Sequence, residues 1–204
     1  MSIGEFVVQC DLICHPDPMV GYRISSPEGV LAYLTDHEPA LGLREFPAAP
    51  EWTSGYAVAI DADLLFHDCQ YDDEEYLTRQ GWGHSSLRQA FAFAELARVR
   101  ELVTFHHDPA RTDSGLDQRL EEAIQDLRPT FTVTAGYEGR EFTLPLRSAP
   151  AGASLEQISG LPTARPRRAP KCDHDALTGP SQRESAPGMT PPSHATRIYI
   201  YGDW

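Results

Sequence analysis

The first half of the chain alternates apolar and polar positions in the way that half-buried strands do. Runs of this kind cover residues 5–13, 20–25 and 30–35, and the turn sequence Ser26-Pro27-Glu28-Gly29 separates the last two. A period of two is typical of β-strands, and a turn rich in Pro and Gly between two such runs predicts a hairpin. Further apolar runs follow at 55–61 and 63–66. The second of these is predicted to be a short buried strand.

The second half changes to helical periodicity. Apolar residues recur three to four positions apart at Leu87, Ala90, Phe91, Ala94 and Ala97, and again at Leu116, Leu120, Ile124 and Leu127. These spacings predict one helix over about 86–100, capped by Ser85 or Ser86, and another from Asp113 or Ser114 to about 127. Strands are predicted at 101–105, 130–135 and 141–146, the last two as a hairpin around Gly136 and Gly139. The acidic run 72–75 is expected to be a solvated loop. This order favours an α/β fold with two helices on a mixed sheet.

Composition divides the chain near residue 147. Residues 1–147 hold 11 Arg against 25 Asp and Glu, whereas residues 148–204 hold 6 basic and 5 acidic residues together with 8 Pro. The second segment has almost no apolar periodicity and cannot bury enough apolar area to offset the entropy of ordering. We therefore predict a globular domain over 1–147 and a disordered tail over 148–204. The aromatic end of the tail, 198–204, is expected to be an idle terminus.

Charge and hydropathy limit the partners of the protein. The formal charge of −13 argues against a general nucleic-acid binder, because an acidic surface repels the phosphate backbone. The one basic cluster, Arg165-Pro166-Arg167-Arg168 with Lys171, lies in the tail and is expected to be solubilising. The sequence has no stretch of 18 uncharged apolar residues, so no membrane span is expected.

The four cysteines do not indicate a disulfide scaffold. Cys10 and Cys14 lie on one face of a predicted strand about 13 Å apart, which is too far for a disulfide. The two-residue spacings of a zinc knuckle are absent. Residues 1–11 also lack a secretory signal pattern. Together these features predict free thiols in a reducing cytoplasm.

Histidines and aspartates gather where the predicted strands end. They are His15, Asp36, His37, His67, Asp68, His106, His107 and Asp108, and His84 lies just before the first helix. In a normally ordered sheet they share one edge, where ligand sites tend to form. Imidazole and carboxylate together suit zinc, manganese or iron. Taken singly, each has a plainer interpretation: a strand-end His is commonly a surface residue, and Asp36 could be a turn residue before Pro39.

Five motifs then occur in one order along the chain. They are His15-Pro16 with Gly21-Tyr22-Arg23-Ile24, Ala32-Tyr33-Leu34-Thr35-Asp36, Asp63-Leu64-Leu65-Phe66-His67-Asp68, Gly83-His84-Ser85-Ser86, and Leu102-Val103-Thr104-Phe105-His106. In this order and spacing, residues 4–146 resemble the C-terminal half of a metallo-β-lactamase-fold hydrolase. The nearest branch is the one that contains ribonuclease Z and related phosphodiesterases. The resemblance implies half of an αββα sandwich, and the tail has no counterpart in it.

The resemblance also implies roles for individual residues. His15 matches a ligand of one metal, Asp36 the carboxylate that bridges two metals, and His106 a ligand of the second metal, with His107 as the alternative. Asp68 and His84 match the pair that handles protons on the substrate or leaving group, although the family commonly has Glu where this chain has Asp68. The implied cofactor is a pair of zinc ions, with manganese or iron as alternatives. Two such ions share a hydroxide and stabilise an oxyanion.

The chain lacks one motif that the family has. The family motif His-x-His-x-Asp-His, which supplies four metal ligands, is absent, and His15 is the first histidine of the chain. Three ligands divided between two metals hold neither tightly, so the site is expected to be incomplete. A half-domain would also expose an apolar sheet face. Three explanations are open: a fragment of a split or frame-disrupted gene, a chain that complements a separate N-terminal half-domain, or a chain that self-associates.

Two functions follow from the sequence. The first is a metal-dependent hydrolase of phosphodiester or related ester bonds that is active only when the missing half is supplied. The alternative is a catalytically inactive, truncated half-domain that acts as a protein-interaction module.

Overall fold

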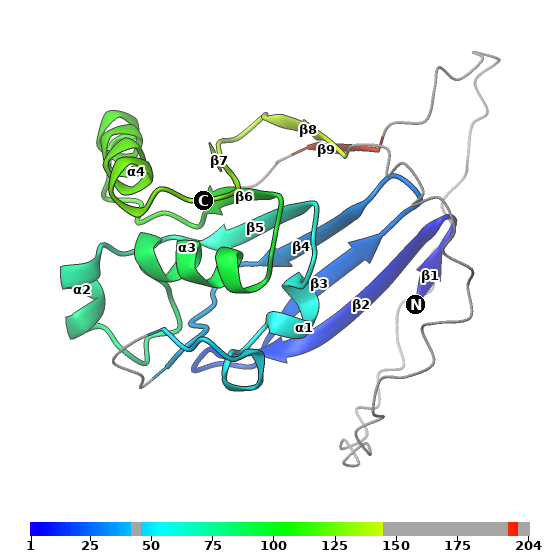
Figure 1. Cartoon of the computed structure of the whole chain (residues 1–204), viewed down its shortest axis with the longest axis horizontal. Coiled ribbons are helices and arrows are strands. Elements are labelled where there is room, and N and C mark those ends of the chain that lie inside the picture. Colours follow the sequence, from blue (N-terminus) through cyan, green and yellow to red (C-terminus); the bar gives the residue numbers. More distant parts are fainter. Residues whose placement is uncertain (42–45, 145–195, 200–204) are drawn as a thin grey trace, which may run out of the picture. The chain divides into compact units, whose positions relative to one another are not determined.

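A seven-stranded mixed sheet runs through the computed structural model, which describes residues 1–41, 46–144 and 196–199 (Figure 1). The order of its strands follows the sequence. They are β1 (Ser2–Ile3), β2 (Phe6–Ile13), β3 (Met19–Ser25), β4 (Val30–Leu34), β5 (Leu64–Asp68), β6 (Glu101–Phe105) and β7 (Thr132–Ala135). The strands from β1 to β4 pair antiparallel, and those from β4 to β7 pair parallel. β2, β4, β5 and β6 therefore all end at the same edge of the sheet.

The strands at the centre of the sheet are apolar because they are buried on both faces. β4, β5 and β6 are almost entirely buried and consist of near-continuous apolar runs, as is typical of parallel strands covered on both faces. The predicted hairpin between β3 and β4 is confirmed: the Ser26 N–H donates to the Gly29 carbonyl at 2.9 Å, and the Gly29 N–H donates back at 3.3 Å. Gly21 of β3 leaves room for the Leu34 side chain, since a Cβ there would meet it.

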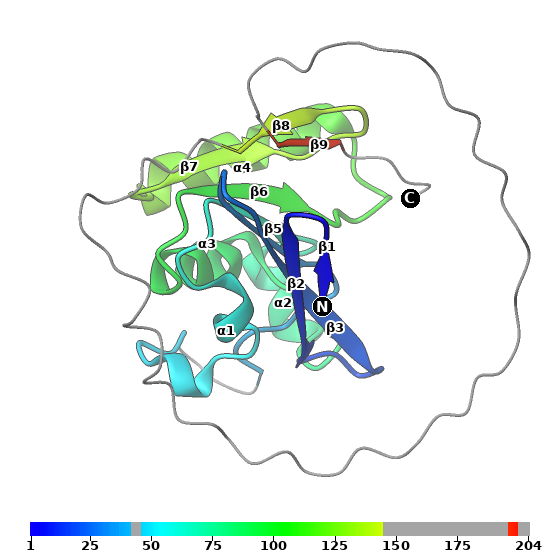
Figure 2. The same ribbon diagram turned by 90° about the vertical axis from the view of Figure 1, so that its right-hand side faces the viewer.

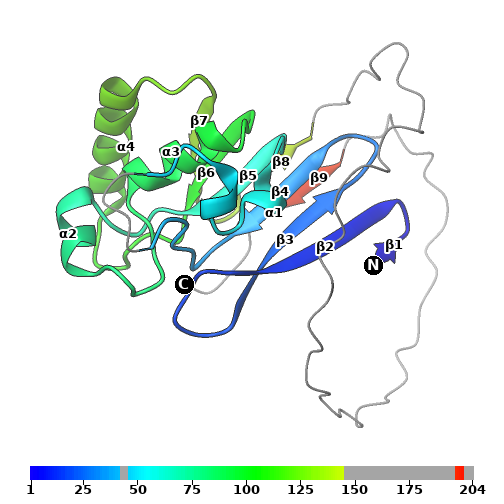
Figure 3. The same cartoon turned by 60° about the horizontal axis from the view of Figure 1, so that its bottom comes forward.

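Helices cover one face of the sheet. Those that pack on it are α1 (Tyr56–Ala59), α3 (Leu87–Leu96) and α4 (Asp113–Leu127). The described residues also form α2 (Asp73–Thr78) and a short 3-10 helix, η1 (Pro50–Trp52). Buried side chains of α3 pack with Leu34, Leu65 and Leu102 of the sheet, and apolar residues of α4 pack against the same core. The Ser86–Gln89 capping box fixes the start of α3. The hairpin of β2 and β3 extends beyond these helices (Figure 3).

A two-stranded sheet covers part of the opposite face. It pairs β8 (Glu141–Thr143) with β9 (Arg197–Tyr199), and the two strands lie side by side above the main sheet in Figure 2. Phe142 and Leu144 pack there against Phe66, Val103 and other side chains of the main sheet. The predicted hairpin between 130–135 and 141–146 is therefore wrong. The expectation of an idle chain end is wrong for residues 197–199, whereas the remainder of the predicted tail, 148–195 and 200–204, lies outside the described residues.

Three further boundaries differ from the sequence prediction. The acidic run 72–75 is not a loop, because Asp72 and Glu75 form a capping box and α2 begins at Asp73. α3 stops at Leu96 rather than near residue 100, since Arg98 has a left-handed backbone (φ 53°) that turns the chain into β6. The run 55–61 contains α1. The fold class itself, helices on a mixed sheet, is confirmed.

The hairpin of β2 and β3 is the least covered part of the sheet. On the face opposite the helices, Leu12 keeps 71% and Tyr22 40% of its surface exposed, and Cys10 is exposed as well. β1 pairs only with the first two residues of β2. Beyond it, the carboxylate of Asp11 accepts the Leu12 N–H at 2.9 Å. Among the described residues, no helix has the length and apolar character needed to cross a membrane.

Candidate metal centre

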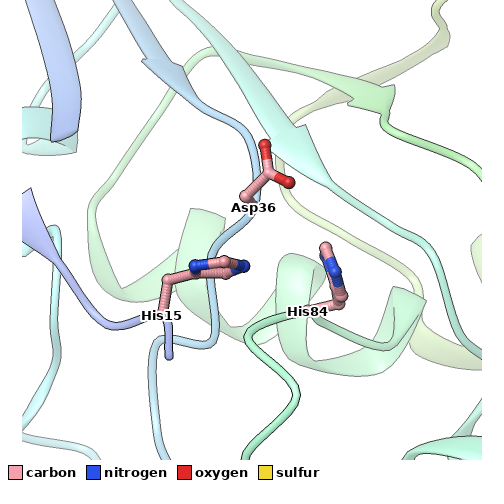
Figure 4. A group of neighbouring side chains, drawn as sticks. All are labelled: His15, Asp36 and His84. Carbon is pink, nitrogen blue, oxygen red and sulfur yellow. The ribbon is translucent and has the colours of Figure 1, made fainter. Parts of the chain in front are cut away.

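Five side chains from separate segments meet at the edge where the strands end. His15 follows β2, Asp36 follows β4, Asp68 is the last residue of β5, and His106 follows β6. His84 precedes α3 and reaches the same edge, where Figure 4 shows its ring beside His15 and Asp36. The common direction of β2, β4, β5 and β6 explains this convergence, because their carboxyl ends must lie together. The structure thus brings together the five residues to which the resemblance assigns a role.

The distances within this group are short enough for a metal ion. Ligand atoms of His15, Asp36 and His84 all lie within 4.8 Å of one another, and so do those of Asp68, His84 and His106. His106 Nε2 lies 3.3 Å from Asp36 Oδ1, which joins the two sets. The rings of His84 and His106 stack with centroids 5.0 Å apart. A donor set of imidazoles and carboxylates fits zinc, manganese or iron.

Backbone strain marks two of these residues. Asp36 (φ 50°) and His106 (φ 52°) both have left-handed backbones, which side-chain-bearing residues seldom adopt. Each such conformation costs on the order of 1 kcal/mol or more and persists only where the surrounding structure enforces it. Strained residues of this kind cluster at functional sites. Asp61, Arg98 and Arg128 also have positive φ away from this edge, so backbone strain by itself does not separate a functional role of Asp36 from that of a turn residue.

Asp68 holds His84 in one orientation. Its carboxylate is fully buried, and Oδ2 lies 2.7 Å from His84 Nδ1. Oδ1 accepts backbone N–H groups from Ser85 at 3.0 Å and from Gln70 at 3.1 Å. Burial alone would lower the pKa of His84, but the hydrogen bond and charge of Asp68, helped by Asp36 and Glu38, raise it above the usual value. The shorter Asp side chain therefore still reaches the histidine.

The other strand-end histidines are placed elsewhere. His37 and His67 are fully buried, with His37 Nδ1 3.0 Å from His67 Nε2, and both pack on Phe93. Burial lowers the pKa of both, and the pKa of His107 is lowered for the same reason. His107 lines a cavity of about 430 Å³ beside α4. It is His106, not this alternative, that approaches Asp36.

Sequence reasoning missed one buried carboxylate in this region. Glu38 lies two residues after Asp36, is 1% exposed, and accepts hydrogen bonds from Tyr76, Gly81 and Gly83. The signal available in the sequence was a glutamate between His37 and Pro39, a few residues after a predicted strand. Such a position gives no indication that the partners are backbone groups of a distant loop.

Comparison with known proteins finds sequence relatives but no matching family model. Ribonuclease Z from Thermoplasma acidophilum is 37% identical over 73 residues, which cover 36% of this chain and 23% of that protein. Zinc phosphodiesterase ELAC protein 1 from Mus musculus is 33% identical over 75 residues, or 36% of this chain and 21% of that protein. A longer match to ribonuclease Z from Crocosphaera subtropica is 22% identical over 185 residues, or 72% of this chain and 59% of that protein.

Solved structures with similar backbones include the metallo-β-lactamase-fold protein YhfI from Bacillus subtilis and the short form of human tRNase Z. YhfI has a TM-score of 0.48 and 19% identity, covering 67% of this chain and 48% of that one. The human protein has a TM-score of 0.43 and 24% identity, covering 53% and 38%. The chain spans about a quarter of the length of the first curated relatives that it matches. The sequence matches confirm the resemblance over part of the chain: segments of 73 to 98 residues are 32–37% identical to proteins named ribonuclease Z or zinc phosphodiesterase.

Proposed function

We propose that this chain contributes a metal-binding edge to a hydrolase of phosphodiester or related ester bonds. The observation that carries the proposal is the convergence of five side chains at one edge, where His15, Asp36 and His84 form one group at metal-site distances and Asp68, His84 and His106 form another (Figure 4 shows the first group). His106 Nε2 also lies 3.3 Å from Asp36 Oδ1. The substrate class comes from the relatives, which are named ribonuclease Z and zinc phosphodiesterase. The acidic surface argues for a small or locally recognised ester rather than for general binding of nucleic acid.

His15, Asp36 and His106 are the residues proposed to hold metal, with Asp36 between the two histidines. Zinc is the preferred ion, with manganese or iron as alternatives. When bound, such an ion lowers the pKa of a coordinated water and stabilises negative charge on an ester oxygen. The strained backbones of Asp36 and His106 keep their side chains directed to this common point.

Asp68 and His84 are proposed to manage protons. Asp68 occupies Nδ1 of the imidazole, so Nε2 remains to hold or release a proton. The carboxylate also favours the charged imidazolium, as the raised pKa indicates. His84 can therefore carry a proton to higher pH than a free imidazole does, and it can give that proton to the leaving oxygen of an ester.

A complementary partner is proposed to supply the remaining metal ligands. The sequence has no His-x-His-x-Asp-His motif, and three ligands are too few for two ions. The exposed apolar side chains of β2 and β3, with Leu12 the most exposed, offer a surface for a half-domain that carries this motif. Self-association is the competing arrangement. Free thiols at Cys10, Cys14 and Cys69 support a reducing, cytoplasmic setting.

The same exposed surface favours a second candidate function. If the metal edge is inactive, the apolar face around Leu12 and Tyr22 would serve as a protein-interaction surface. Metal binding separates the two candidates, because an interaction module does not need the strained Asp36 and His106.

The test is metal binding and hydrolysis by the full chain. Zinc and manganese are titrated by calorimetry, and hydrolysis of bis(p-nitrophenyl) phosphate is followed with and without a half-domain carrying His-x-His-x-Asp-His. Asp36→Ala is expected to weaken zinc binding by more than about 100-fold, whereas Asp126→Asn on the exposed side of α4 leaves it unchanged. Unaltered zinc binding in Asp36→Ala, or two tightly held ions per chain without a partner, would refute the ligand assignment.

A further inference from the structure

Glu38 is a buried carboxylate whose partners are concentrated in one distant loop. Its Oε1 accepts the Tyr76 hydroxyl at 2.8 Å and the Gly81 N–H at 2.9 Å. Its Oε2 accepts the Gly81 N–H at 3.0 Å and the Gly83 N–H at 2.9 Å. A buried carboxylate is costly unless hydrogen bonds satisfy it, and here each of these partners is a donor. The side chain thereby ties the end of β4 to the loop that leads into His84.

The backbone of the same residue reaches a second segment of the site. The Glu38 N–H donates to the carbonyl of Cys14 at 3.0 Å, directly before His15. The Cys14 N–H in turn donates to the Ser54 hydroxyl at 2.7 Å. Glu38 is thus hydrogen-bonded to Cys14, the residue before His15, and to Gly83, the residue before His84. It also lies two residues after Asp36 in the sequence.

Gly83, which is hydrogen-bonded to Glu38, also lies in direct contact with the imidazole ring of His15. Gly83 has a left-handed backbone (φ 91°), and a Cβ there would lie 2.6 Å from Pro16 Cδ and 2.8 Å from His15 Nε2. The bare backbone at Gly83 therefore packs directly against the His15 ring. The rings of His15 and His84 are edge-to-face at 5.7 Å. The hydrogen bond to the Gly83 N–H consequently sets the spacing of the two imidazoles.

We propose that Glu38 is a positioning residue of the candidate metal centre, because it holds the loop of Gly81 and Gly83 so that His15 and His84 face Asp36. The proposal rests on the proposed function of that centre. Glu38 does not itself join the metal-ligand groups, so it acts through the loop. Hydrogen bonds from backbone N–H groups to a carboxylate are about twice as strong as neutral ones, which suits a single side chain that must fix a glycine-rich loop.

The predicted effects of substitution follow from the donors. Glu38→Met keeps the length of the side chain and removes every acceptor. Glu38→Gln can keep its oxygen at the Oε2 position, where it accepts the Gly83 N–H and, at 3.0 Å, the Gly81 N–H. Its amide nitrogen then takes the Oε1 position, donates to the Tyr76 hydroxyl and gives up the second contact with Gly81. Glu38→Asp keeps the charge but is one methylene too short to reach the loop in the same way. Tyr76→Phe removes one donor and leaves both glycine bonds in place.

The first measurement needs no metal. Amide hydrogen exchange of the full chain is expected to accelerate at least tenfold at Gly81 and Gly83 in Glu38→Met and Glu38→Asp, with shifted ring signals of His15 and His84. Glu38→Gln and Tyr76→Phe stay near the wild type. If Glu38→Met does not fold, Glu38→Asp carries the test. Unchanged exchange and unchanged ring signals in the folded variants would overturn the proposal, whether or not the wild type binds zinc.

The second measurement is the zinc affinity. A loss of about 10- to 100-fold is expected for Glu38→Met and Glu38→Asp, the range typical of residues that orient metal ligands. Glu38→Gln restores it to within about threefold. Val99→Ala, a core change at the other end of β6, controls for lost stability and leaves the affinity unchanged. Faster glycine exchange with wild-type zinc affinity would overturn the positioning role. No zinc binding by the wild type would instead overturn the proposed function.

Discussion

Replacing Asp68 by asparagine removes the negative charge of the side chain and keeps its shape, so it measures the contribution of the charge alone. The carboxylate is fully buried and accepts four hydrogen bonds: His84 at 2.7 Å, Ser85 at 3.0 Å, Gln70 at 3.1 Å and the His37 N–H at 3.4 Å. In Asp68→Asn, the remaining side-chain oxygen can keep the Ser85 and Gln70 bonds only if the new amide nitrogen faces His84. His84 Nδ1 must then accept rather than donate, so its proton moves to Nε2.

The magnitude follows from the one strong bond that is lost. A hydrogen bond to a charged group contributes about 1.5–3 kcal/mol, and the other two backbone bonds to Oδ1 are retained. Because a neutral hydrogen bond, which contributes about 0.5–1.5 kcal/mol, replaces the bond that is lost, we expect Asp68→Asn to lower the free energy of unfolding by about 1–1.5 kcal/mol near pH 6. Asp68→Ala is expected to cost more, because it leaves the backbone N–H groups of Ser85, Gln70 and His37 without their acceptor.

The pH dependence has a definite sign. The pKa of His84 is raised in the folded chain, so its contribution to stability is fully present below the unfolded value of 6.5 and is lost as the pH rises through the folded value. The difference in stability between wild type and Asp68→Asn is thus largest below pH 6.5 and shrinks as the pH rises through the folded pKa of His84. Urea unfolding at several pH values and NMR titration of the His84 ring, both without metal, measure these effects. An unaltered His84 pKa in Asp68→Asn would refute the reasoning, and Asp126→Asn serves as the matched control.

Three further expectations can be checked by unfolding and binding experiments. Asp36→Gly relieves the positive φ and is expected to raise the free energy of unfolding by about 0.5–1 kcal/mol while weakening zinc binding by over about 100-fold; a stability loss would contradict the strain argument. Phe142→Ala removes the ring that packs 5.3 Å from Phe66 and is expected to cost about 3–5 kcal/mol by thermal denaturation; a loss below about 1 kcal/mol would mean that the β8–β9 cover is dispensable. Gly83→Ala is expected to displace the His15 ring and shift its NMR signals, whereas Gly139→Ala, with open space around it, leaves them in place.

The fold could be predicted from sequence where local patterns decide it. The alternation in β2 and β3 and the helical spacing in α4 each identify an element within a few residues of its true bounds. α2 was missed because its acidic sequence carries no apolar stripe, and it forms through the Asp72–Glu75 capping box and the burial of Tyr76. The pairing of β8 with β9 was missed because it joins segments that are far apart along the chain, and no local pattern encodes such a pairing.

For the candidate site too, the sequence predicts the residues but not the contacts that hold them in place. The strand ends made His15, Asp36 and His106 visible among nine titratable candidates, and the resemblance to a known family selected these three as metal ligands. The order of the strands brings them together. The supporting contacts could not be predicted, because Glu38 is held by backbone N–H groups, which every residue except proline carries. The left-handed backbones of Asp36 and His106 likewise arise from tertiary packing and leave no sequence mark.

The carboxylate of Asp11 affects how this chain can meet another. An exposed edge strand is a template for strand addition, which leads to swapped assemblies and aggregates. In β2, however, the Leu12 N–H already donates to the Asp11 carboxylate, so an incoming strand would have to displace that carboxylate. The displaced negative charge would then lie close to the backbone carbonyls of the incoming strand. The Asp11 carboxylate thus disfavours backbone pairing of a second copy of the chain with the free edge of β2. Any stable association in this region is expected to use the side chains of the hairpin rather than its backbone.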